Sequence, residues 1–154
     1  GVKLINELGL CEELELKDLK YVLRTKDLIG IWAMITDVDY AFTKKEKDLI
    51  KKIKLVMNEN INDIFVKYKY GSYPISVVSD LKRINTKKIM SNYEKLPIKD
   101  RDELNITVEE ICKLLGKAPD SFLKEIFEDI EKKVLMGKIP NKKEELKKYI
   151  SNKY

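Results

Sequence analysis

The stretch that decides the fold is residues 96–149, which read LPIKDRDELNITVEEICKLLGKAPDSFLKEIFEDIEKKVLMGKIPNKKEELKKY. Local end signals place a first helix in it. Thr107 and Glu110 form an S/T-x-x-E capping box, in which each side chain accepts a hydrogen bond from the other residue's backbone N–H. Gly116 suits the left-handed turn that ends a helix. These signals predict a helix between Thr107 and Gly116.

Signals of the same kind predict two further helices. Pro119 suits the first position of a second helix, where no intrahelical partner exists for a backbone N–H, and Gly137 lies just past its end. Asn141 with Glu144 predicts the cap of a third helix. Because the connections are short, the three helices are expected to form one compact unit.

The second of these helices has an apolar face. Apolar residues recur there every four positions, which places them on one stripe of a 3.6-residue helix. The stripe consists of Phe122, Ile126, Ile130 and Val134, flanked by Leu123 and Phe127. It predicts a core helix with a solvated back.

Similar patterns precede residue 96. Thr43 with Glu46 predicts a helix start, followed by an apolar stripe and a lysine-rich outer face, and Thr86 is expected to cap a later helix. Residues 14–36 are apolar at helical spacing. Gly30 within them either interrupts a helix or lets another helix approach closely.

The fold class follows from what the pattern contains and lacks. No segment alternates apolar and polar residues as a half-buried strand does, and no Asn-Gly hairpin signal occurs. The sequence therefore predicts an all-α fold of about eight to ten short helices. The segment 97–105 carries a proline, dense charge and no apolar stripe. It predicts a boundary between a helical domain of residues 1–96 and a second one of residues 97–154.

Composition indicates a protein with a real core and a charged surface. Apolar residues make up 44% of the chain and charged residues 37%. No apolar run reaches the roughly 18 residues of a membrane span, and no secretory signal is visible, so we expect a cytoplasmic protein without a membrane partner. Gly1 in place of Met suggests a piece of a longer parent. Trp32, Cys11 and Cys112 lie in apolar patterns and are predicted to be buried, the cysteines as thiols in a reducing compartment.

The chain contains no histidine, which removes histidine general bases, Ser-His triads and histidine metal sites. Asp37 and Asp39 are the one carboxylate pair that we consider as a candidate for a two-metal site. No glycine-rich turn precedes them and no sheet is expected to carry them. We therefore predict no catalytic residue and no metal site in this chain.

Residues 96–149 resemble the C-terminal tail of bacterial class II CCA-adding tRNA nucleotidyltransferases, relatives of the poly(A) polymerases. Order and spacing agree over about fifty residues. The matching segments are Leu96-Pro97-Ile98-Lys99-x-Arg101-x-Glu103-Leu104, Gly116-x-x-Pro119, Phe122-Leu123-Lys124-Glu125 and Val134-Leu135-x-Gly137-Lys138-Ile139-x-Asn141-x-Lys143, then Leu146 and Tyr149. The family's base-selecting Glu-Asp-x-x-Arg motif is absent.

The resemblance implies that residues 1–96 are the family's body, with the end of its neck, and residues 97–154 its tail. The chain would then be a tRNA-binding C-terminal fragment that grips the acceptor and T arms. CTP, ATP and magnesium would bind only in a missing N-terminal head, so this chain alone is not expected to be catalytic. Lysines and helix starts suit a phosphate backbone. The predicted RNA-binding residues are Lys99, Arg101, Lys117, Asn141, Lys142 and Lys143.

Several alternatives stay open. The parent could be a poly(A) polymerase, or an enzyme that adds only A or only CC. An alternative function of a different class is that of a helical protein-interaction or dimerisation module. Residues 1–81 contain 13 basic and 13 acidic residues, whereas residues 82–154 contain 18 and 13, which points to nucleic acid or to lysines spread over solvated faces. Tyr68, Tyr70 and Tyr73 either stack unpaired bases or are half-buried at a helix end.

Overall fold

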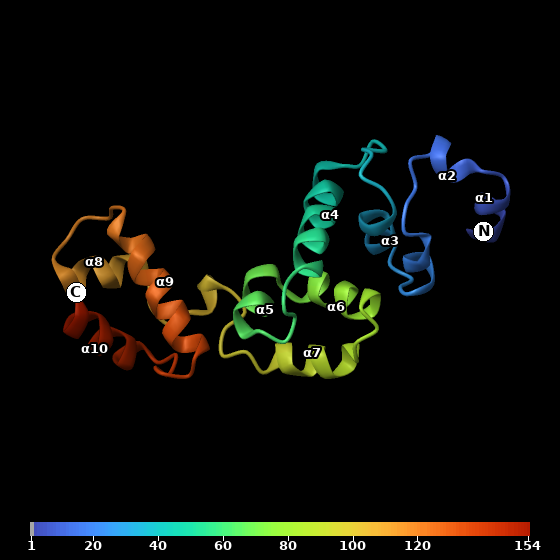
Figure 1. Ribbon diagram of the computed structural model, residues 1–154. Helices are drawn as coiled ribbons and strands as arrows, with labels where there is room; N and C mark the ends of the chain where they lie inside the picture. The colour runs from blue at the N-terminus through green and yellow to red at the C-terminus, as the bar shows by residue number, and fades with distance from the viewer. Residues whose placement is uncertain (1) are drawn as a thin grey trace. The chain divides into compact units, whose positions relative to one another are not determined.

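The computed structural model describes residues 2–154, without the side chains of Val2 and Asn6. Over that range the chain forms ten α-helices and two 3-10 helices, and no strand occurs among the described residues (Figure 1). The all-α prediction is confirmed. The chain divides into two compact units, Gly1–Glu94 and Lys95–Tyr154, and each is described separately below. The assignment of residues 1–96 and 97–154 to a body and a tail stays a prediction.

The first unit is built around helix α6, which contacts α3, α4, α5 and α7. Pro74, Ile75, Val77, Val78 and Leu81 of this helix are all buried. The helices of the unit, in chain order, are α1 Val2–Glu7, α2 Leu10–Glu13, η1 Leu19–Leu23, α3 Leu28–Ile35, α4 Lys44–Met57, α5 Ile64–Tyr70, α6 Ser72–Leu81 and α7 Thr86–Glu94.

Side chains that lie just before α3, α4, α5 and α7 cap the first turns of these helices. The capping box of Thr43 and Glu46 is present at the start of α4, as predicted. The cap predicted for Thr86 is wrong: its hydroxyl donates to Asp80 Oδ1 at 2.5 Å, while Asn85 Oδ1 accepts from Lys88 N at 3.1 Å. Asn85 is therefore the residue that caps α7, because its amide oxygen reaches a free first-turn N–H.

Residues 14–36 are less regular than their apolar spacing suggests. Asp18 has a left-handed backbone with φ of 49°, and only the short η1 follows it. Asp27 then starts α3 by accepting a hydrogen bond from Gly30 N at 2.7 Å. A Cβ on Gly30 would collide with Val77 Cγ1 of α6, so Gly30 does let another helix approach closely. Trp32 is half-buried rather than buried, because it faces the rim of a pocket.

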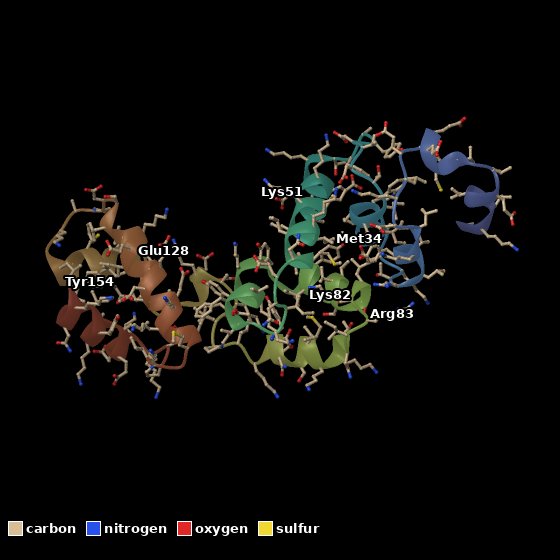
Figure 2. The ribbon with its side chains drawn as sticks, viewed as in Figure 1. Met34, Lys51, Lys82, Arg83, Glu128 and Tyr154 are labelled. Carbon is tan, nitrogen blue, oxygen red and sulfur yellow. The ribbon has the colours of Figure 1, made fainter. Side chains whose placement is uncertain are left out.

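The second unit contains η2 Arg101–Glu103, α8 Val108–Leu115, α9 Phe122–Leu135 and α10 Lys143–Lys153. Its core confirms the predicted apolar face of α9, since Ile126, Ile130 and Val134 are all at most 1% exposed. Ile111 of α8 and Leu146 of α10 are fully buried as well. Charged side chains such as Glu128 extend outward from the ribbon (Figure 2).

Three local predictions in this unit meet different outcomes. The capping box of Thr107 and Glu110 is present, and Gly116 ends α8 in the left-handed region with φ of 63°. The helix start predicted at Pro119 is wrong, because a turn follows it, in which Leu123 N donates to Asp120 O at 3.1 Å, and α9 begins only at Phe122.

The predicted burial of the two thiols is also wrong. Cys11 and Cys112 are both half-buried.

Candidate nucleic-acid interface

The residues predicted to bind RNA lie in three places in the second unit. Lys99 lies before η2 and Arg101 begins it, and Lys117 lies in the loop after α8. The other three residues, Asn141, Lys142 and Lys143, lie together at the start of α10. Lys117 and the two lysines before and in α10 are exposed, whereas Lys99 and Asn141 are half-buried. The set is therefore not one continuous patch of free cations, and each place has its own chemistry.

Asn141 does not cap α10, which corrects the prediction made for it. The residue at the cap position is Lys142, with no side-chain cap. The side chain of Asn141 accepts from Asn105 N at 2.9 Å and donates to Glu103 O at 2.8 Å, while its carbonyl accepts from Asn105 Nδ2 at 2.7 Å. Asn141 thus ties the end of η2 to the start of α10, because both polar ends of its amide have backbone partners.

The start of α10 leaves backbone donors unsatisfied by any side chain. Lys142 is exposed and has no ion-pair partner among the described residues. Lys143 Nζ lies 3.0 Å from Glu110 Oε1, which Lys147 also approaches at 3.3 Å. The contact with Lys143 is the main reason that the pKa of Glu110 is lowered. An exposed helix start with lysines suits an anion.

Arg101 is engaged inside the unit. Its Nε donates to Glu131 Oε1, a carboxylate on α9 whose side chain is only 12% exposed. Its guanidinium also lies 5.3 Å from the centre of the Phe127 ring. Arg101 therefore holds η2 against α9. Nearby, Lys99 donates its backbone N–H to Glu103 Oε2 at 2.7 Å.

Lys117 is placed by the loop between α8 and α9. Its Nζ lies 5.3 Å from the centre of the Phe122 ring, a weak cation–π contact at an exposed site. Because Pro119 precedes α9 by three residues, Lys117 does not lie directly at a helix start as expected. It remains an exposed cation at the end of the unit where α9 begins.

An ion cluster that the sequence did not indicate joins α9 to the C-terminal end of α10. Asp129 accepts from Tyr149 Oη at 2.6 Å and lies 2.8 Å from Lys153 Nζ. Burial raises the pKa of Asp129, but hydrogen bonds from Lys153 and Tyr149 outweigh it, and the net shift is downward. Asp129 lies 20 or more residues from both partners, so no local spacing could have revealed the cluster.

The two aspartates that the sequence offered as candidate metal ligands lie in the first unit. Asp37 is paired with Lys17 and Lys54, and Asp39 with Lys47. In the range 2–154, no group of three or more His, Cys, Asp or Glu residues is arranged to hold a metal.

The tyrosines considered for base stacking are not alike. Tyr68 and Tyr70 are half-buried on α5. Tyr73 Oη donates to both carboxylate oxygens of Asp27 at 2.9 Å. Burial and then the hydrogen bond to Asp27 raise the pKa of Tyr73 to about 12.

Fold and surface together define an all-helical chain of two units with exposed lysines at the start of α10. None of the described helices is both long and apolar enough to cross a bilayer. The family model for tRNA nucleotidyltransferase domain 2 matches residues 38–150, and the chain belongs to that family. This match and the relatives below together confirm the resemblance to CCA-adding enzymes.

Individual relatives of this chain are CCA-adding enzymes. The chain is 29% identical over 163 residues to a CCA-adding enzyme of Anoxybacillus flavithermus, covering 93% of this chain and 41% of the relative. It is 31% identical over 135 residues to that of Staphylococcus haemolyticus, covering 88% and 34%. The chain thus spans less than half the length of these relatives.

A solved structure shares the fold. The crystal structure of the Bacillus stearothermophilus CCA-adding enzyme in complex with CTP superposes with a TM-score of 0.66 at 18% identity, covering 73% of this chain and 31% of that one.

Proposed function

We propose that this chain is the tRNA-binding body and tail of a CCA-adding tRNA nucleotidyltransferase, and that its second unit grips the acceptor and T arms. The observation that carries the proposal is the exposed start of α10, with Lys142 unpaired among the described residues, in a chain of the tRNA nucleotidyltransferase family. Duplex RNA is recognised mainly through its backbone, which suits such a site.

The addition of nucleotides is assigned in this proposal to a part of the protein outside residues 1–154. CTP, ATP and magnesium would be bound by a head outside residues 1–154, and a cytoplasmic location would follow from action on tRNA. The identity of the added nucleotides depends on that head, so enzymes that add A, CC or poly(A) fit this region equally well.

Among the predicted contacts, Lys142 and Lys143 are the best test. Arg101 is unsuitable, because its replacement would break its contacts with Glu131 and Phe127. Replacing Lys142 and Lys143 together by alanine should weaken tRNA binding. Because fewer phosphate contacts mean that binding releases fewer counterions, the slope of log affinity against log salt should fall by about one to two units.

The measurement is tRNA affinity across a salt series, with thermal melting as the folding control. The double variant Lys124→Ala/Lys132→Ala removes two exposed lysines of α9 and serves as the matched control for net charge. If Lys142→Ala/Lys143→Ala leaves the tRNA affinity and the salt slope unchanged, the start of α10 does not bind RNA. Tight self-association without tRNA binding would instead support the protein-interaction module.

A further inference from the structure

One carboxylate of α8 holds two lysines of α10, and these two helices lie side by side (Figure 1). Lys143 Nζ lies 3.0 Å from Glu110 Oε1, and Lys147 Nζ lies 3.3 Å from the same oxygen. The two lysines are four residues apart, so both reach α8 from one face of α10. The side chain of Lys143 is 52% exposed and that of Glu110 is 24% exposed, so water and ligands have access to the pair.

This cluster carries a net positive charge, because two ammonium groups share one carboxylate oxygen. Glu144 and Glu145 are exposed in the first turn of α10, but neither forms an ion pair with a described lysine. Glu110 is therefore the only carboxylate among the described residues within ion-pair distance of these two lysines. Its pKa is lowered chiefly by the hydrogen bond from Lys143, so it is ionised at neutral pH.

Glu110 has a separate role in the cap of α8, and this role involves its other oxygen. Thr107 N donates to Glu110 Oε2 at 3.2 Å, and Glu110 N donates to Thr107 Oγ1 at 3.3 Å. Glutamine fills the same position of a capping box as well as glutamate does. The substitution Glu110→Gln therefore removes the charge that faces the lysines and keeps the cap.

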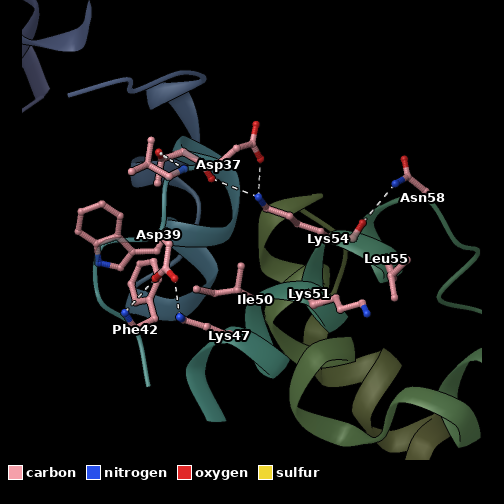
Figure 3. A pocket seen from close by; sticks show the side chains of 12 residues that line it. Asp37, Asp39, Phe42, Lys47, Ile50, Lys51, Lys54, Leu55 and Asn58 are labelled. Atoms are coloured by element: carbon pink, nitrogen blue, oxygen red, sulfur yellow. Dashed lines mark hydrogen bonds and ion pairs between the residues drawn. The ribbon is translucent and has the colours of Figure 1, made fainter. Parts of the chain in front are cut away.

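A comparison with the first unit shows that the lysines of this cluster are held loosely. Lys54 also pairs with a carboxylate, that of Asp37, but its Nζ donates in addition to Thr36 O at 3.2 Å (Figure 3). The two lysines at Glu110 have no second polar partner among the described residues. Because an exposed ion pair in water is weak, another anion can take the place of Glu110.

From these contacts we infer that Glu110 is an internal counter-ion of the RNA site at the start of α10. It holds Lys143 in the free chain, and a backbone phosphate replaces it when tRNA binds. A phosphate on Lys143 with Glu110 still in place would bring two like charges to one ammonium group, so exchange is favoured over sharing. Glu110 thus lowers the affinity for tRNA. The inference rests on the proposed function of the second unit.

The neighbouring lysines Lys142 and Lys143 provide a matched test, because only Lys143 has an ion-pair partner among the described residues. The tRNA affinity of the chain of residues 1–154 is measured across a salt series. Lys142→Ala should reduce the slope of log affinity against log salt by somewhat less than one unit, as expected for one lost phosphate contact. Lys143→Ala should weaken binding less than Lys142→Ala does, because the native Lys143 must first leave Glu110.

Glu110→Gln should bind tRNA about two- to five-fold more tightly than the native chain at low salt, as expected when one exposed ion pair no longer has to break. The gain should shrink as salt screens the charges. Glu109→Gln makes the same change of net charge at the adjacent exposed residue, which has no lysine partner among the described residues. This control should bind tRNA nearly as the native chain does. Melting curves verify that both variants are folded.

A double-mutant cycle separates exchange from a structural role of Glu110. Lys143→Ala should weaken tRNA binding about two- to five-fold more in the Glu110→Gln background than in the native chain. Equal losses in the two backgrounds, or a Glu110→Gln variant that binds tRNA no more tightly than the native chain, overturns the inference. If Lys142→Ala still weakens binding, the proposed function survives that result. If neither Lys142→Ala nor Lys143→Ala changes the affinity in either background, the RNA site and its counter-ion are both refuted.

Discussion

Asn105 and Asn141, 36 residues apart, are joined by two hydrogen bonds: Asn105 N donates to Asn141 Oδ1 at 2.9 Å, and Asn105 Nδ2 donates to Asn141 O at 2.7 Å. A third bond runs from Asn141 Nδ2 to Glu103 O at 2.8 Å. Together they hold the segment after η2 against the start of α10. A residue predicted to cap a helix and contact RNA is thus a structural connector.

Replacing Asn141 by alanine should therefore destabilise the second unit. Removal of the side chain leaves Asn105 N and Glu103 O without their partners, which costs roughly 1–3 kcal/mol of unfolding free energy. Urea unfolding measures the loss. Asn141→Asp keeps the acceptor for Asn105 N but turns a carboxylate oxygen toward Glu103 O, which is also an acceptor, so this variant should lose stability as well. A purely RNA-contacting Asn141 would leave stability unchanged in both variants.

Ile130→Ala should be among the most damaging core substitutions of the second unit. Ile130 is 0% exposed at the centre of the apolar face of α9. Emptying such a site removes contacts and leaves a cavity, which costs roughly 2–5 kcal/mol. Lys132→Ala, an exposed change on the same helix, should stay within about 0.5 kcal/mol of the native chain. Chemical denaturation compares the two, and a loss below about 1 kcal/mol in Ile130→Ala would contradict its burial.

Gly30→Ala should destabilise the first unit through a single contact. The added methyl group meets Val77 Cγ1, so α3 and α6 must move apart. Overpacking of this kind costs roughly 1–3 kcal/mol, partly offset by the better helix propensity of alanine. In the double variant Gly30→Ala/Val77→Ala the collision is relieved, so its loss of stability should be smaller than the sum of the two single losses. Strict additivity in thermal unfolding would show that the two residues do not meet.

The hydroxyl of Tyr73 stabilises the first unit, and this contribution is lost at alkaline pH. Burial, followed by the hydrogen bond to Asp27, raises the pKa of Tyr73 from 10.0 to about 12 in the folded chain. The folded state therefore keeps a proton that the unfolded state loses, and unfolding free energy decreases as pH rises from about 10 to about 12. Below pH 10 the contribution is fully present.

Tyr73→Phe isolates this contribution. The variant should lose roughly 1 kcal/mol near neutral pH, because the hydroxyl bond to a carboxylate is absent. Its difference from the native chain should shrink between pH 10 and about 12 in unfolding experiments. Tyr70→Phe removes a tyrosine hydroxyl for which no hydrogen bond occurs among the described residues, and it is the matched control. A constant gap in Tyr73→Phe would contradict the raised pKa.

Features that depend on neighbouring residues could be predicted from the sequence. The capping boxes of Thr43 with Glu46 and Thr107 with Glu110 involve partners three residues apart, and both are present. The buried stripe around Ile130 follows from helical periodicity alone. Such patterns settle the all-α class, because they require no knowledge of how the helices pack. The family resemblance likewise rests on spacing within one continuous stretch.

Features that depend on distant partners were decided only by the tertiary structure. Asn141 has the right type and position for a cap, but packing brings the backbone of Asn105 within reach, and its amide bonds there. Arg101 is predicted to bind RNA and is exposed, but its contact with Glu131, 30 residues away, could not be predicted from spacing. Trp32 was expected in the core and instead lines a pocket. A side chain's partner is whichever polar or apolar group the folded chain brings closest, and sequence spacing does not encode that distance.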